Sequence, residues 1–118
     1  MRKLILLPFL FFSLLILGQT NSKKDSLEIK KLIDTAEKIS ISSSAEGALI
    51  CNEALQLAKA KKYFKLDNYA YNVLGRIYSA NGKVDESKKY FNQAISLSKK
   101  YNDKTMLCST YCDLGSLL

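Results

Sequence analysis

Histidine and tryptophan are absent from this 118-residue sequence, which contains a single proline. Without histidine, the chain lacks the most common general base of hydrolases and the most common zinc ligand. Its three cysteines can neither form a four-cysteine zinc site nor pair completely as disulfides. A glycine-rich phosphate loop and a nucleophile motif are also missing. We therefore expect no enzyme, no cofactor and no metal site.

The N-terminal segment differs in kind from the rest of the chain. A positively charged start precedes an apolar run from Leu4 to Leu17, and the small residue Gly18 follows it. This layout is typical of a secretory signal peptide, and the run is short for a bilayer span of about 20 apolar residues. We expect residues 1–18 to be a signal peptide and residues 19–23 to be a short polar linker. An uncleaved anchor and a buried core helix are the alternatives.

Basic residues outnumber acidic ones by 18 to 11, which gives a formal net charge of +7. They occur as scattered lysine doublets, such as Lys61-Lys62 and Lys88-Lys89, and not as one cluster. Scattered doublets of this kind usually form a solvated surface. A nucleic-acid surface would need clustered basic residues with interleaved aromatic ones. We expect no nucleic-acid partner, and an enzyme or a nucleic-acid binder is the least favoured of three functional readings.

Apolar residues recur at helical spacing through the remainder of the chain. Glycine is rare there and proline is absent, so long helices with few turns are favoured. Asp25 with Glu28 is a candidate N-cap pair, Ser43 with Glu46 resembles a capping box, and Gly82 supplies a left-handed C-cap. The pattern predicts five helices, at about 25–41, 45–61, 64–80, 84–100 and from 104 onward.

The chain contains an internal repeat. When it is shifted by 40 residues, eight of the 34 positions in 45–78 are identical to those in 85–118. Ordinary residue usage would give roughly two matches. Two helices recur in each period, so each unit is predicted to be a helical hairpin.

The sequence YNVLGRIY, from Tyr71 to Tyr78, resembles the first helix of a tetratricopeptide repeat. Asn81 to Lys83 resembles the turn of that repeat, and Ser87, Phe91 and Ala94 fall at the small, aromatic and alanine positions of its second helix. Ser87 stands where the family usually has alanine, and the family proline after the second helix is missing. The longer period is similar to that of repeats in bacterial regulators.

This resemblance implies an all-α fold, a right-handed α-solenoid of antiparallel helical hairpins. Residues 24–118 would provide five helices, or about two and a half repeats. Gly75 and Gly115 would lie where two helices approach too closely for a side chain. The residues expected to pack within and between repeats are Tyr71, Leu74, Gly75, Tyr78, Ser87, Phe91, Ala94, Tyr111, Leu114 and Gly115.

The first helices of such repeats line a groove that binds a partner. Asn72 and Arg76 match in type the family residues that hold a ligand's backbone or carboxylate, and ordinary solvated residues are the alternative reading. The residues that this register places in the groove are Tyr69, Asn72, Arg76, Ser79, Ser109 and Asp113.

The cysteines have ordinary explanations. Cys51 aligns with Phe91 at a packing position, so we expect a small core side chain. Cys108 and Cys112 lie four apart on one helix face, where an intrahelical disulfide is difficult. A two-cysteine metal site and an intermolecular disulfide are the alternatives for this pair.

The function implied is protein–protein interaction. The chain stops within a repeat's first helix, so we expect it to be truncated at the C-terminus, the rival being a short protein that dimerises through this open helix. We expect the exported N-terminal sensor part of a larger bacterial signalling or regulatory protein, binding a peptide or protein ligand. Its location would be periplasmic, or outward-facing and attached to a membrane through sequence beyond Leu118. The alternative is a free-standing periplasmic or surface adaptor for assembly or secretion.

Overall fold

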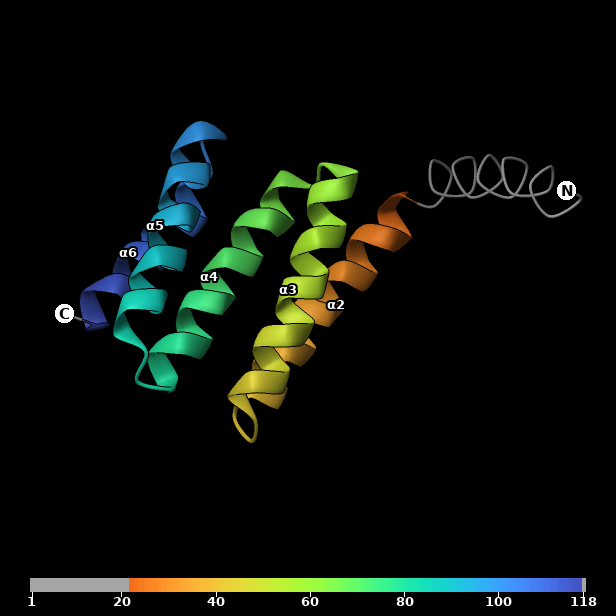
Figure 1. Cartoon of the computed structure of the whole chain (residues 1–118). Coiled ribbons are helices and arrows are strands. Elements are labelled where there is room, and N and C mark those ends of the chain that lie inside the picture. The colour runs from red at the N-terminus through yellow and green to blue at the C-terminus, as the bar shows by residue number, and fades with distance from the viewer. Residues whose placement is uncertain (1–21, 118) are drawn as a thin grey trace, which may run out of the picture.

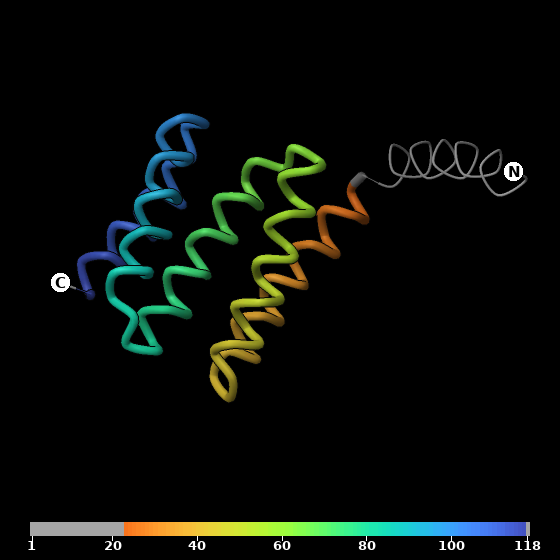
Figure 2. Tube along the Cα trace, in the orientation of Figure 1, coloured from red at the N-terminus to blue at the C-terminus, as the bar shows by residue number. Residues whose placement is uncertain are grey.

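The computed structural model describes residues 22–117, which form five α-helices joined by short turns (Figure 1). The described residues include no strand. Turns of two or three residues leave no room for a crossover, so successive helices run antiparallel and the chain reverses at alternate ends of the stack (Figure 2). The expected signal peptide at residues 1–18 lies outside the described residues. The helices are α2 Ser22–Ser40, α3 Ser44–Lys61, α4 Phe64–Ala80, α5 Val84–Lys100 and α6 Lys104–Leu117.

The helices are arranged in two layers. Each helix packs against the next, and α4 also contacts α2 and α6, whereas α3 and α5 make no contact with each other. An inner layer is therefore formed by α2, α4 and α6, and an outer layer by α3 and α5. Within the inner layer α4 contacts both α2 and α6, whereas the two helices of the outer layer do not touch. The stack therefore curves toward the inner layer. Figure 1 views the molecule with the outer helices in front. The expected all-α helical-repeat solenoid is confirmed.

Local sequence sets the ends of the helices. The Ser43 hydroxyl accepts a hydrogen bond from the Glu46 amide at 3.3 Å, which caps the start of α3. Gly82 has φ +77° in the turn after α4, as its C-cap role predicted. Asn102 has φ +55° in the turn before α6, and Asp103 then accepts a hydrogen bond from the Met106 amide at 3.2 Å. These turns stop one helix and start the next within three residues.

The tightest helix–helix contact joins α4 to α5. A Cβ atom on Gly75 would lie 2.5 Å from the Phe91 ring, so only glycine permits this approach. The Ser87 hydroxyl donates a hydrogen bond to the Gly75 carbonyl at 2.7 Å and is itself fully buried. Tyr71, Leu74 and Ala94 complete this part of the core, and Tyr78 is half-buried at its edge.

The beginning of the first helix differs from the expectation. The helix starts at Ser22, which lies within the expected linker, and Asp25 is inside its first turn instead of capping it. Asp25 forms an ion pair with Lys61 of α3 at 2.5 Å. This contact lies beyond the reach of local sequence reasoning, because the two residues are 36 positions apart.

The last helix corrects part of the expected packing set. Tyr111 is 46% exposed, and nothing lies within 4 Å of the position that a Cβ atom on Gly115 would occupy. Leu114 is half-buried. The described residues place no further helix against this face of α6, so these side chains lack the neighbour that α5 provides to their counterparts in α4.

None of the helices between residues 22 and 117 is long and apolar enough to cross a bilayer. The same residues contain no group of three or more side chains arranged to hold a metal ion. Cys51 is buried in the core, whereas Cys108 and Cys112 are exposed free thiols.

Candidate interaction surface

The inner surface is the face of α2, α4 and α6 where polar side chains from all three helices meet. Four of the six groove residues expected from sequence lie in this network, and the structure adds Asp34, Glu37 and Thr110 to them. The residues of the inner surface are Asp34 and Glu37 on α2, Tyr69, Asn72 and Arg76 on α4, and Thr110 and Asp113 on α6.

Arg76 connects the three inner helices. Its guanidinium forms two contacts with the Glu37 carboxylate, at 3.1 Å from Nη1 to Oε1 and 3.2 Å from Nη2 to Oε2. Its Nε lies 3.9 Å from Oδ2 of Asp113 on the opposite side. A paired arrangement of this kind fixes direction as well as distance. Arg76 therefore helps to hold α2, α4 and α6 in register.

Asn72 is part of the helix packing. Its side-chain amide donates hydrogen bonds to Thr110 Oγ1 at 3.1 Å and Asp113 Oδ2 at 3.0 Å. Only 1% of its surface is exposed. A buried amide without these acceptors would be costly, so the bonds favour the observed position of α6. In this arrangement Asn72 presents almost no surface to a ligand.

Tyr69 extends the network toward the start of the stack. Its hydroxyl donates a hydrogen bond to Asp34 Oδ1 at 2.5 Å. Burial raises the pKa of this phenol, and the hydrogen bond to Asp34 acts in the same direction. Asp34 also pairs with Lys30 at 3.4 Å on its own helix. The phenol is therefore a neutral hydrogen-bond donor at any physiological pH.

The remaining two expected groove residues lie beside this network. Ser109 is exposed and Ser79 is half-buried, and both share helix faces with members of the inner surface. Their exposure makes them better probes of a bound partner than Asn72 is.

The carboxylates on α2 were not predicted as site residues. Asp34 and Glu37 are three apart and therefore share one face of α2, which was the available signal. That helix resembles the repeat motif least, so its register against α4 could not be assigned. Their presence changes the chemistry of the surface, because Arg76 already engages a carboxylate of the protein itself.

The family comparison agrees with the hairpin formed by α4 and α5. The family model described as tetratricopeptide repeat matches residues 69–101. No curated protein and no solved structure matched the chain. Tetratricopeptide repeats are typically non-enzymatic scaffolds that bind protein partners. Residues 69–101 of this chain match the tetratricopeptide repeat, which typically serves as a protein–protein interaction module.

Proposed function

We propose that the inner surface binds an extended segment of a protein partner. The observation that carries this proposal is the tetratricopeptide repeat at residues 69–101, whose first helix contributes the centre of the inner surface. Polar side chains from three helices converge there, so a segment crossing the stack would meet donors and acceptors from each repeat.

The charges of the inner surface favour a ligand rich in hydrogen-bond donors. The inner surface carries three carboxylates, of which Glu37 and Asp113 flank the Arg76 guanidinium and Asp34 accepts from Tyr69. A ligand carboxylate would have to displace that internal pair. Backbone N–H groups and basic side chains of a partner would find acceptors that are already oriented.

Site-specific photo-crosslinking tests this proposal in cells of the source organism. A photoreactive phenylalanine analogue replaces Ser109 on the inner side of α6 and, as the matched control, Gln56 on the outer helix α3; both positions are exposed. A defined partner band that forms from position 109 and not from position 56 is the expected result. Equal labelling from both positions, or from neither, would contradict an inner binding surface.

For the cellular role we propose the exported sensor part of a larger bacterial signalling or regulatory protein. The signal-like start followed by a tetratricopeptide repeat supports this reading, since that combination is similar to the outward-facing region of such proteins. The alternative is a free-standing periplasmic or surface adaptor. An antibody against residues 60–100, used on fractionated cells, separates the two: a large membrane-associated product supports the sensor, and a small soluble exported product supports the adaptor.

A further inference from the structure

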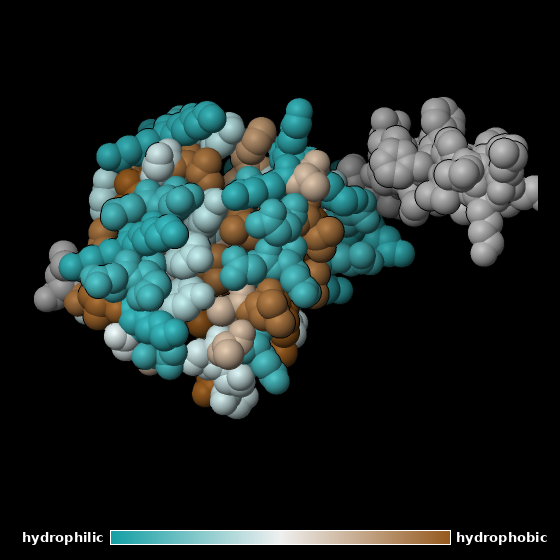
Figure 3. Space-filling model, viewed as in Figure 1, coloured by the Kyte–Doolittle hydropathy of each residue, from teal (hydrophilic) through white to brown (hydrophobic). Residues whose placement is uncertain are grey.

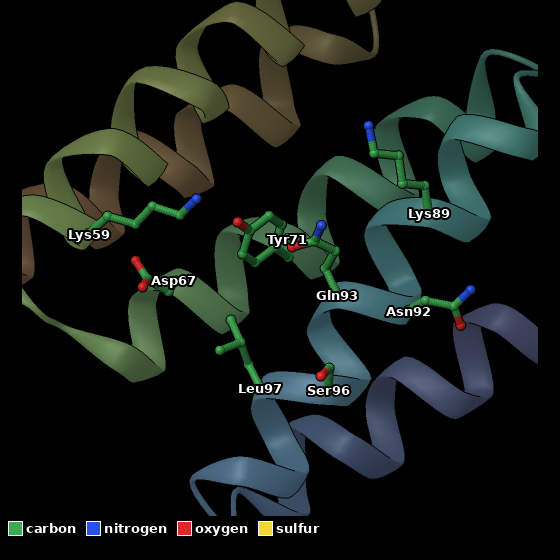
Figure 4. Close-up of a pocket in the computed structure, with 8 residues that line it drawn as sticks. All are labelled: Lys59, Asp67, Tyr71, Lys89, Asn92, Gln93, Ser96 and Leu97. Carbon is green, nitrogen blue, oxygen red and sulfur yellow. The ribbon is translucent and has the colours of Figure 1, made fainter.

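A cleft of about 600 Å³ opens on the outer side of the stack, opposite the inner surface. It lies where α3 and α5 do not touch, and α4 forms its floor. Figure 4 shows side chains from all three helices around it, with Lys59 entering from α3 and Lys89 from α5. Hydrophilic side chains cover much of this outer side (Figure 3). We call this hollow the outer cleft.

A row of three tyrosines underlies the outer cleft and continues beyond it. Tyr71 and Tyr90 have ring centroids 6.3 Å apart, and Tyr90 and Tyr78 are 5.4 Å apart and nearly parallel at 7°. Tyr78 in turn lines a second hollow of about 330 Å³ beside the start of α3. The row therefore connects two hollows along the outer side, so that an extended peptide segment could contact both of them.

Each tyrosine of the row carries a lysine ammonium close to its ring. The Nζ atoms of Lys59, Lys83 and Lys89 lie 5.2, 5.9 and 5.9 Å from the ring centroids of Tyr71, Tyr78 and Tyr90, respectively. Lys59 comes from α3, Lys83 is the N-cap residue of α5 and Lys89 lies in α5 itself, and all three are exposed. The fold thus gathers basic and aromatic groups that are scattered along the chain. Such a surface attracts negative charge, and the half-buried rings of Tyr78 and Tyr90 offer planar apolar contact beside it.

Asp67 is the one carboxylate among the described residues that line the outer cleft. It is only 7% exposed, and no described residue forms a hydrogen bond with its Oδ1 atom. Figure 4 shows this side chain pointing from α4 toward Lys59. A buried acceptor without a donor favours a ligand that brings an N–H group. A peptide backbone supplies such donors, whereas the phosphodiester backbone of a nucleic acid would place another negative charge there.

From these observations we propose that the outer cleft is a second binding site, which takes an extended acidic peptide segment of a partner protein. Acidic side chains of that segment would lie near Lys59, Lys83 and Lys89, and its backbone would run along the tyrosine row. This site is separate from the inner surface and does not depend on the function proposed for that surface.

Fluorescence anisotropy with the full chain tests the second site. The probe is a short fluorescein-labelled peptide of repeated Glu-Ser-Gly, which remains extended, and its counterparts are a Lys-Ser-Gly peptide and an oligothymidylate of the same charge. We expect the acidic peptide alone to bind at physiological salt. Absence of binding by the acidic peptide, or equal binding by the oligothymidylate, would overturn the proposal, the latter by revealing a general polyanion surface.

Charge reversal locates the binding site. The double variant Lys59→Glu/Lys89→Glu should weaken binding of the acidic peptide by about tenfold or more. The control variant Lys31→Glu/Lys104→Glu has the same net charge, and its exposed positions do not line the cleft; its affinity should stay within about twofold of the wild type. Equal weakening by both variants would show that net charge alone is responsible and would reject the site. If the double reversal fails to fold, the neutral variants Lys59→Gln and Lys89→Gln provide the same comparison.

Discussion

Arg76 on α4 holds Glu37 on α2 through two parallel contacts and lies 3.9 Å from Asp113 on α6. The side chain therefore spans the whole inner layer of the described stack. This arrangement has two consequences. Arg76 contributes to the geometry of the repeats, and its capacity to bind a ligand's carboxylate is already in use.

Replacing Arg76 by alanine should loosen the packing of both α2 and α6 against α4. The paired side chains of Arg76 and Glu37 are more than one-third exposed, so we expect a loss of only about 1 kcal/mol in the free energy of unfolding. Hydrogen–deuterium exchange should become faster in α2 and α6 than in α5. Lys31→Ala, an exposed change on α2, is the control and should leave exchange unchanged. Unaltered exchange in the Arg76→Ala protein would show that the bridge does not hold the helices.

Arg76→Lys separates charge from geometry. Lysine keeps the positive charge but cannot form two parallel contacts with one carboxylate. We therefore expect this variant to resemble Arg76→Ala in its exchange rates. Exchange rates equal to those of the wild type would mean that the positive charge alone maintains the packing of the inner layer.

Much of the architecture could be predicted because its determinants are local. Gly82 sets the end of α4, Ser43 caps α3, and apolar spacing fixes which face of each helix is buried. The contacts of α2 could not be predicted. Glu37 and Arg76 are 39 positions apart, and their pairing depends on how far one hairpin is displaced along the next.

The outer cleft could not be predicted from the sequence for a related reason. Lys59 is more than 20 positions before Lys83 and Lys89 in the sequence, so these lysines counted as dispersed surface charge. The stacking of α3 on α4 places Lys59 beside Tyr71, the turn between α4 and α5 places Lys83 beside Tyr78, and Lys89 lies next to Tyr90 on α5. The aromatic row itself depends on Tyr90 of α5 lying between two tyrosines of α4.

Adding one methyl group at Gly75 should destabilise the stack. The new Cβ atom would lie 2.5 Å from the buried Phe91 ring, so the ring or the helix must move. We expect Gly75→Ala to lower the free energy of unfolding by about 1–3 kcal/mol in a denaturant titration. In the double variant Gly75→Ala/Phe91→Leu the ring is absent, so part of the stability lost to the clash should be regained. A loss equal to the sum of the two single changes would reject this contact as the cause.

Gly115 provides the matched control. It is also helical, but nothing lies within 4 Å of the position of an added Cβ atom. Gly115→Ala should therefore raise the stability of the chain by up to about 1 kcal/mol, because alanine favours the helix more than glycine. If Gly75→Ala also raises the stability, helix propensity outweighs packing at Gly75.

The three thiols should differ in reactivity. Cys51 is buried and donates a weak hydrogen bond to the Ala70 carbonyl at 3.4 Å. Burial raises the pKa of this thiol to about 12, with the charge of Glu37 adding to the effect. At neutral pH, a thiol-reactive dye should label Cys108 and Cys112 of the native protein promptly. Cys51 should react only after unfolding, and prompt labelling of all three would contradict its place in the core.

Asp67 should make stability depend on pH in the opposite sense to an ordinary paired carboxylate. Burial raises the pKa of this group above its usual value of 3.8, and the opposing charge of Lys59 does not cancel the effect. Between the unfolded pKa and the raised folded pKa, the native state binds more protons than the unfolded state. The contribution of Asp67 to stability is therefore fully present below the unfolded pKa and is lost as the pH rises through the folded one.

Asp67→Asn removes this dependence while keeping the size of the side chain. Asp67 lies in the first turn of α4, so the variant also gives up a favourable helix-dipole contact of about a few tenths of a kcal/mol. Because the cost of burying the charge is larger, we expect the variant to be more stable than the wild type by about 1 kcal/mol at pH 7, with the difference shrinking as the pH falls toward 4. Urea titrations of both proteins at a series of pH values measure this difference. Asp85→Asn, at an exposed first-turn position of α5, is the control and should lose a few tenths of a kcal/mol at pH 7 because it gives up a favourable helix-dipole contact. An Asp67→Asn protein that is less stable than the wild type at pH 7 would mean that Lys59 and the α4 dipole stabilise the Asp67 charge by more than its burial costs. The argument for a carboxylate that lacks a donor in the outer cleft would then fail.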